Sequence, residues 1–338
     1  MNESYNSSIS VAEEFAEDNR RDMRKNQWIK WSPLLILLFL ILVCSVFIKG
    51  FFSLDNLVSL LNQLALPLII SVGVTFVILL GSINLSVEGL MAMAGSVFSV
   101  LVLNNRTSID IGFWAIPVVV LIGLVAGLIM GIVHVYLKLP SFMVTYAFSF
   151  VFLGIALLSY GGIPATISDA FFASFHTLMF LGVPLITWIA FLLFGIAVFI
   201  QKCTAFGQYI FAAGSNEKVL KSVGVNVSHV KVIVFMFSGG CLAVAGMISA
   251  LRLGRGEILL GKGMMFPAFT AVVLGGTPMS GGRGGMTNTL IGAIIVTVLQ
   301  NGMVMMGISS YVQDGIQGII IVIAVILSVK RGNRVVNK

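Results

Sequence analysis

Two residue patterns in the sequence could support enzyme chemistry, and both fail on spacing or context. Residues 256–263 read GEILLGKG, which matches the phosphate-binding pattern GxxxxGK but has glycine where Mg²⁺ needs Ser or Thr. An apolar, helix-like run precedes this segment instead of the strand that a phosphate-binding loop requires. His134, His176 and His229 have no second histidine or carboxylate at metal-ligand or nucleophile spacing. The chain is therefore predicted to be no enzyme and to hold no cofactor or metal of its own.

Polar residues inside long apolar stretches are better candidates, because such residues often mark transport pathways. They occur in segment 81–89, GSINLSVEG, and in the Gly-rich segment 275–285, GGTPMSGGRGG. The ordinary alternative for both segments is a polar turn at the membrane surface, where Glu88 is solvated and Ser86 caps the next helix. Asp314 and Gln317 are expected at the outer interface. The residues predicted to line a pathway are Asn84, Ser86, Glu88, Phe142, Thr145, Gly275, Gly276 and Thr277.

A polar interval, residues 203–227, separates two long apolar runs and is predicted to contain a short helix. Ser215 or Asn216 can cap its N-terminus, and Gly224 can end it in a left-handed conformation. Two turns of helix are marginal in water, so this helix needs a surface to lie on. That surface is either the membrane or the groove of a soluble partner. The apolar residues predicted to share one face are Val219, Leu220 and Val223.

The hydrophobic and charged fractions of the sequence indicate the class of protein in which these residues lie. Of the 338 residues, 58% are hydrophobic and 10% are charged, which is too few charges for a soluble surface. The chain is therefore predicted to be an all-α polytopic membrane protein, with about ten spans of which the third and eighth are broken or re-entrant. Glycines 123, 127 and 131 are predicted to let a neighbouring helix approach closely. The candidate spans are 32–52, 62–81, 85–103, 113–136, 141–160, 181–200, 229–251, 264–279, 286–306 and 310–329.

The positions of the basic residues predict the orientation. With the N-terminus inside, 15 of the 20 Lys and Arg residues fall on the cytoplasmic side, which favours two cytoplasmic termini. Residues 1–31 form a polar tail, residues 32–330 the transmembrane domain with a cytoplasmic segment at 201–229, and residues 331–338 a second tail. No short early apolar region indicates a cleavable signal peptide. The basic residues form no stripe with interleaved aromatics, so nucleic-acid binding is not expected.

Four stretches resemble the inner-membrane permeases of ribose-type ATP-binding-cassette sugar importers, within the branched-chain amino acid, ribose and nucleoside permease superfamily. They are GSINLSVEGLMAMAGS at 81–96, LPSFMVTYAFSFVFLG at 139–154, FGQYIFAAGSNEKVLKSVGVNV at 206–227 and VVLGGTPMSGGRGG at 272–285. The likeness in order and spacing runs from about residue 33 to 331. The chain departs from the family pattern at Asn84, where aspartate is usual, at Glu88, where glycine is usual, and at Leu153, where arginine is common.

The resemblance implies a permease in a bacterial inner membrane that transports a small, ribose-like sugar. Its implied partners are cytoplasmic ATPase subunits that carry the ATP and Mg²⁺, a second or sister permease, an external solute-binding protein and membrane lipid. A nucleoside-importing permease of the same superfamily and an ion-coupled secondary transporter are the alternatives. The segment implied to couple the permease to the ATPases comprises Ala212, Ala213, Gly214, Ser215, Asn216, Glu217 and Gly224.

Overall fold

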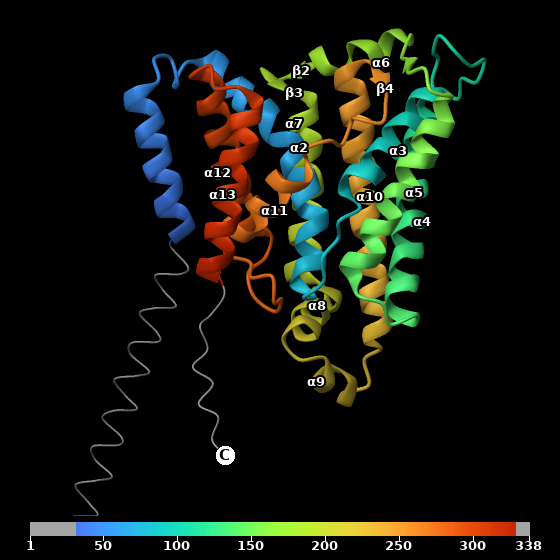
Figure 1. The fold of residues 1–338 in the computed structure, drawn as a ribbon, viewed down its shortest axis with the longest axis vertical. Helices are drawn as coiled ribbons and strands as arrows, with labels where there is room; N and C mark the ends of the chain where they lie inside the picture. The colour runs from blue at the N-terminus through green and yellow to red at the C-terminus, as the bar shows by residue number, and fades with distance from the viewer. Residues whose placement is uncertain (1–31, 329–338) are drawn as a thin grey trace, which may run out of the picture.

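A computed structural model describes residues 32–328 as a bundle of roughly parallel helices (Figure 1). Each of the ten predicted spans coincides with a helix in this range, so the predicted all-α polytopic fold is confirmed. The helices at these spans are Ser32–Phe47, α2 (Leu54–Leu79), α3 (Val87–Leu101), α4 (Ala115–Tyr136), α5 (Ser141–Tyr160), α7 (Leu185–Cys203), α10 (Val227–Leu253), α11 (Met265–Leu274), α12 (Met286–Met305) and α13 (Ser310–Ser328).

Six of these helices, α2, α4, α5, α7, α10 and α12, are long and apolar enough to cross a membrane. Two others, α3 and α11, have only 15 and 10 residues, and each follows a non-helical stretch. They coincide with the third and eighth spans, for which broken helices are predicted. The stretch before α3 has no regular structure over residues 82–86, and the stretch before α11 makes turns over residues 258–263.

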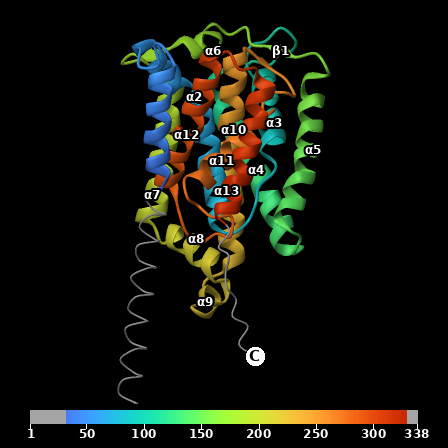
Figure 2. The same cartoon turned by 60° about the vertical axis from the view of Figure 1, so that its left-hand side comes forward.

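The two ends of the bundle carry different structures. One end, here called the α9 end, holds α8 (Ala205–Ser215) and α9 (Glu217–Ser222) (Figure 1). The opposite end, here called the strand end, carries α6 (Ala170–Ser174) and two small antiparallel sheets (Figures 1 and 2). The strands are β1 (Ala165–Thr166) with β4 (Arg255–Gly256), and β2 (Met179–Phe180) with β3 (Val183–Pro184); two 3₁₀ turns are η1 (Gly112–Trp114) and η2 (Phe175–Thr177).

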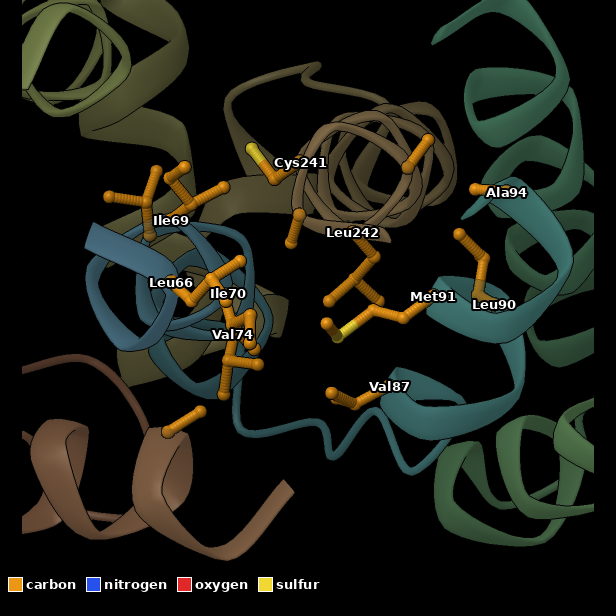
Figure 3. Packing of buried hydrophobic residues seen from close by; sticks show 14 of the residues in the cluster. Leu66, Ile69, Ile70, Val74, Val87, Leu90, Met91, Ala94, Cys241 and Leu242 are labelled. Carbon is orange, nitrogen blue, oxygen red and sulfur yellow. The ribbon is translucent and has the colours of Figure 1, made fainter. Parts of the chain in front are cut away.

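Helix α10 is the centre of the packing and contacts α2, α3 and α4. Side chains of α2, α3 and α10 face one another in a single apolar core (Figure 3). Against α4, a methyl group added to Gly123 would lie 2.6 Å from the carbonyl oxygen of Gly239. One added to Gly239 would lie 2.9 Å from the Cα of Gly127. The predicted small-residue ladder is thus confirmed, and it brings the two backbones together as such ladders do in membranes.

The three cysteines fit this bundle without forming a cluster. Cys44 and Cys241 are buried, whereas Cys203 is exposed where α7 ends, and all three are free thiols. Within residues 32–328, no group of three His, Cys, Asp or Glu side chains could hold a metal ion.

Candidate functional site

The predicted coupling segment forms two helices rather than one. Helix α9 begins after Asn216, whose side chain accepts hydrogen bonds from the N–H groups of Lys218 (3.0 Å) and Val219 (3.4 Å). Gly224 has a φ of +80°, as a left-handed ending requires. The short helix, its cap and its end are therefore confirmed. Helix α8, which begins at a Thr204 cap and packs between α7 and α9, was not predicted as a separate element.

The predicted apolar face of α9 is wrong in detail. Leu220 is buried, but Val219 is 59% exposed and Val223 is 69% exposed. Leu220 thus holds α9 to the bundle, while the two valines point away from it. Exposed apolar side chains at the end of a bundle are what a docking partner would cover.

Gly214 joins the coupling segment to the end of α2 and to the Gly-rich segment 275–285. The N–H of Gly282 donates to the carbonyl of Leu79 (2.9 Å), which ties segment 275–285 to the end of α2. The Ser215 hydroxyl donates to the carbonyl of Gly282 (3.3 Å). A methyl group on Gly214 would lie 2.6 Å from the Gly282 nitrogen and closer still to the Leu79 oxygen. Only glycine allows these three backbone segments to meet at the α9 end.

Segment 81–86 runs extended between α2 and α3, and its backbone groups need partners because water is excluded at membrane depth. Hydroxyl groups of α5 supply them: Ser141 Oγ accepts from the Ile83 N–H (3.0 Å), and Thr145 Oγ1 accepts from the Leu85 N–H (2.9 Å). Thr145 is completely buried and does not line the cavity described below. Thr145 therefore serves as a hydrogen-bond acceptor for the non-helical backbone of segment 81–86.

We expect the substitution Thr145→Val to leave the Leu85 N–H unsatisfied and to destabilise the fold by about 1–3 kcal/mol. Thr297→Val is the matched control, because Thr297 is also buried but bonds only the Ala293 carbonyl of its own helix (2.8 Å). Thermal unfolding of both purified variants in detergent measures the difference. Equal melting temperatures for the two variants would contradict the assigned role of Thr145.

Asn84 and Ser86 form a second buried polar cluster inside the same segment. The Asn84 side chain donates to Ser238 Oγ (3.1 Å) and accepts from the Ser86 hydroxyl (2.7 Å). Ser86 precedes α3 but makes no side-chain cap, so the capping role considered for it is wrong. Ser238 lies near the middle of the 27-residue α10. Segment 81–86 therefore reaches the middle of the bundle, and its end is not a turn at the membrane surface.

The N-termini of the two half-helices meet at this depth, with Glu88 between them. Glu88 lies in the first turn of α3, and its Oε1 accepts a hydrogen bond from the Gly263 N–H (3.1 Å), just before α11. A methyl group on Gly261 would lie 2.7 Å from the Glu88 Cα, so the two segments touch. The positive ends of both helix dipoles thus face one carboxylate, an arrangement typical of substrate sites between broken membrane helices.

A cavity of about 830 Å³ opens beside Glu88. It extends toward the strand end, because it reaches Arg252 at the end of α10 and Tyr311 at the start of α13. Toward the α9 end, α2, α11 and α12 contact one another, and the hydroxyls of Thr75 and Thr289 are 2.8 Å apart. The polar residues that line the cavity are Gln63, Glu88, Arg252, Lys262, Gln300, Ser310, Tyr311, Gln313, Asp314 and Gln317.

Of the residues predicted for the pathway, the structure brings only Glu88 to this cavity. Phe142 is 45% exposed at the start of α5. Gly275, Gly276 and Thr277 lie at the end of α11, where Thr277 Oγ1 accepts from the Gly285 N–H (3.1 Å). Phe142 is thus exposed, whereas the other three residues belong to the Gly-rich segment 275–285. None of the four lines the cavity.

Sequence reasoning missed most of the cavity. Asp314 and Gln317, which were expected at the outer interface, both line it, and Gln317 is only 4% exposed. Gln63 and Gln300 lie well inside α2 and α12. A glutamine beside an asparagine within an apolar span (Asn62 and Gln63, Gln300 and Asn301) was the available signal, since polar side chains inside membranes face a protein interior or a pathway.

Comparisons with known proteins agree with this architecture. Residues 56–325 match the family described as branched-chain amino acid transport system / permease component. The chain is 38% identical to the ribose import permease protein RbsC of Haemophilus influenzae, over 88% of this chain and 92% of that protein. It is 35% identical to RbsC of Bacillus subtilis (89% and 93%) and 32% identical to RbsC of Escherichia coli (92% and 97%). No solved structure matches the chain significantly.

Proposed function

Because the chain belongs to the family of branched-chain amino acid transport system permease components, we propose that it is the membrane-spanning subunit of a sugar importer of the ATP-binding-cassette class. The sugar is small and ribose-like, as the names of the three relatives indicate for those proteins. The membrane is the bacterial inner membrane, which the chain crosses several times. Both termini and the α9 end face the cytoplasm, in keeping with the distribution of basic residues.

The single observation that carries the proposal is the cavity beside Glu88. Its amides and carboxylates can accept and donate hydrogen bonds to several hydroxyl groups at once, which is what a sugar offers. Phe266 and Tyr311 add rings that can pack on the apolar face of a sugar. The cavity reaches the strand end, and contacts among α2, α11 and α12 separate it from the α9 end, so in the orientation proposed here it would receive solute from outside.

The energy for transport comes from partner subunits in this proposal. The GxxxxGK-like segment packs against Glu88 through Gly261 and Gly263, and nucleotide binding is assigned in this proposal to the partner subunits. Cytoplasmic ATPase subunits that hold ATP and Mg²⁺ would dock on α9, where Val219 and Val223 are exposed. A second permease and an external solute-binding protein complete the assembly.

The path from the docking site to the cavity is short. Helix α8 contacts segment 275–285 through Gly214 and Ser215, and that segment continues directly from α11. Helix α11 has ten residues, so it spans about 15 Å between segment 275–285 and Glu88. A displacement of α8 by the ATPases can therefore move α11 and open its contacts with α2 and α12. Differential affinity of the partners for the two arrangements supplies the shift.

Two alternatives make different predictions. A nucleoside permease of the same superfamily would share the architecture but prefer a nucleoside to a sugar. An ion-coupled transporter is favoured only by the charged residues in the cavity, namely Glu88, Asp314, Arg252 and Lys262. Membrane carboxylates are typical coupling groups, so this class requires a direct test.

The test reconstitutes the purified chain in liposomes, with and without its ATPase subunits and its binding protein. We expect accumulation of labelled ribose only when the ATPases and ATP are present, and we expect it to survive collapse of the proton gradient. Accumulation by the chain alone would contradict the proposal. Excess unlabelled nucleoside that abolishes ribose uptake would favour the nucleoside alternative.

A further inference from the structure

A second cavity, of about 500 Å³, lies at the α9 end and is separate from the pathway. Three parts of the chain enclose it: the end of α4 with the turn that follows, helix α9, and the first two turns of α10. Its lining consists of His134, Val135, Lys138, Leu139, Pro140, Glu217, Lys221, Val227, Ser228 and Lys231.

The lining of this cavity is strongly basic. Each of the three enclosing parts contributes one lysine, Lys138, Lys221 or Lys231, and Glu217 is the one carboxylate among the lining residues. Glu217 already forms an ion pair with Lys231, while Lys221 Nζ lies 3.9 Å from the other carboxylate oxygen of Glu217. Lys138 makes no ion pair with the described residues. Positive charge around the cavity thus exceeds negative charge, and an anion would balance it.

Two backbone features add to this preference for an anion. The 27-residue α10 begins at the cavity with Val227 and Ser228, and the first N–H groups of a helix attract negative charge and bind phosphate. Lys138 has a φ of +55°, in the left-handed region that residues other than Gly, Asn and Asp seldom adopt. The turn after α4 therefore has a lysine at a backbone conformation that glycine or asparagine would adopt at a lower energy. Such an outlier is a pointer to function.

Apolar side chains beside the cavity indicate where the anion comes from. Tyr136, Leu137 and Leu139, at the end of the membrane-spanning α4, are 58%, 64% and 44% exposed. A free phosphate ion would make no favourable contacts with these apolar side chains. A phospholipid would place its acyl chains against them and its phosphate among the lysines, as lipid headgroups do in basic pockets between membrane helices.

We propose that this cavity binds the headgroup phosphate of an anionic phospholipid and thereby links α9 to the membrane body. The lipid would stand between α4, α9 and α10, where Glu217 and Lys231 already join the last two. The assignment to the inner leaflet rests on the orientation proposed above. The binding itself is independent of the transported solute.

The experiment measures lipid binding to the purified full-length chain in detergent by native mass spectrometry and by thermal unfolding. Phosphatidylglycerol is titrated against phosphatidylcholine and against inorganic phosphate. Lys138→Asn removes the charge and suits the left-handed turn, and Lys138→Asn with Lys221→Gln removes two charges. Lys202→Asn is the matched control, because Lys202 is exposed at the same end of the bundle but does not line the cavity.

We expect phosphatidylglycerol to remain bound to the wild-type chain and to raise its melting temperature. Its affinity should fall about fivefold with Lys138→Asn and about 25-fold with the double substitution, since each lysine near an anionic headgroup contributes about that factor. Lys202→Asn should bind as the wild type does. Equal binding by all variants, or equal binding of phosphatidylcholine, would overturn the proposal. Competition by inorganic phosphate at equal concentration would show a site for free anions instead and would overturn the lipid assignment. No transport is measured, so failure of this test leaves the permease function untouched.

Discussion

ATP-driven sugar uptake should fall to background when Gly214 is replaced by valine. The new side chain would overlap the backbone of Leu79 and of Gly282, so α8 would have to leave the two segments that it touches. Backbone atoms cannot move aside as a flexible side chain can, and overpacking of this kind costs about 1–3 kcal/mol. A loss of that size at a coupling contact corresponds to about a 5- to 160-fold lower rate of transport. Uptake and sugar-stimulated ATP hydrolysis in liposomes with the partner subunits measure the effect.

Gly195→Val is the matched control for this prediction. Gly195 lies in α7, and a methyl group added to it would meet no atom within 4 Å. The variant carries the same change of helix propensity without the overlap, so it should insert and transport like the wild type. If Gly214→Val transported sugar as fast as Gly195→Val, the contact of α8 with the end of α2 and with segment 275–285 would have no part in coupling.

The second large effect is expected at Glu88. Replacing it with leucine removes the acceptor for the Gly263 N–H and places a branched apolar side chain in the cavity between the two half-helices. Because Gly263 is exposed, water can replace its lost acceptor, and the main loss is the hydrogen bond between the sugar and a charged carboxylate, which contributes about 1.5–3 kcal/mol. We expect sugar uptake at limiting substrate to decrease about 100-fold, while basal ATP hydrolysis by the docked partner subunits stays near the wild-type rate.

Glu88→Gln separates the hydrogen bond from the charge. A glutamine carbonyl can still accept from the Gly263 N–H and still bonds hydroxyl groups, so this variant should retain most of the uptake. If Glu88→Gln were as inactive as Glu88→Leu and the wild type lost uptake when the proton gradient collapsed, the negative charge would be a coupling group. That outcome would favour the ion-coupled alternative.

Local features of the coupling segment were predictable because their causes are local. The Asn216 cap and the left-handed Gly224 follow from side-chain and backbone preferences that act within a few residues. The order of the spans follows equally directly from their length and apolar composition. The existence of α8 was harder to see, because Gly207 and Gly214 lie inside it and glycine disfavours helix.

The lining of the pathway was predictable only in part. Polar residues in segment 81–89 were evident, but nothing local indicates that Glu88 reaches a cavity while Asn84 turns toward α10. In a membrane helix both the lipid-facing and the protein-facing sides are apolar, so periodicity does not reveal which way Phe142 or Thr145 points. The hydroxyl of Thr145 serves a backbone group 60 residues away, a pairing that only the folded bundle defines.

That pairing also bears on how the protein is made. At the elongation rates of about 5–20 residues per second typical of ribosomes, the interval between synthesis of Leu85 and Thr145, 60 residues apart, is about 3–12 seconds. During that time the unwound stretch before α3 has no hydroxyl partners and cannot rest in hydrocarbon on its own. The nascent chain must therefore keep this stretch near water or inside the insertion machinery until α5 emerges, and the third span enters the bilayer together with its later neighbour.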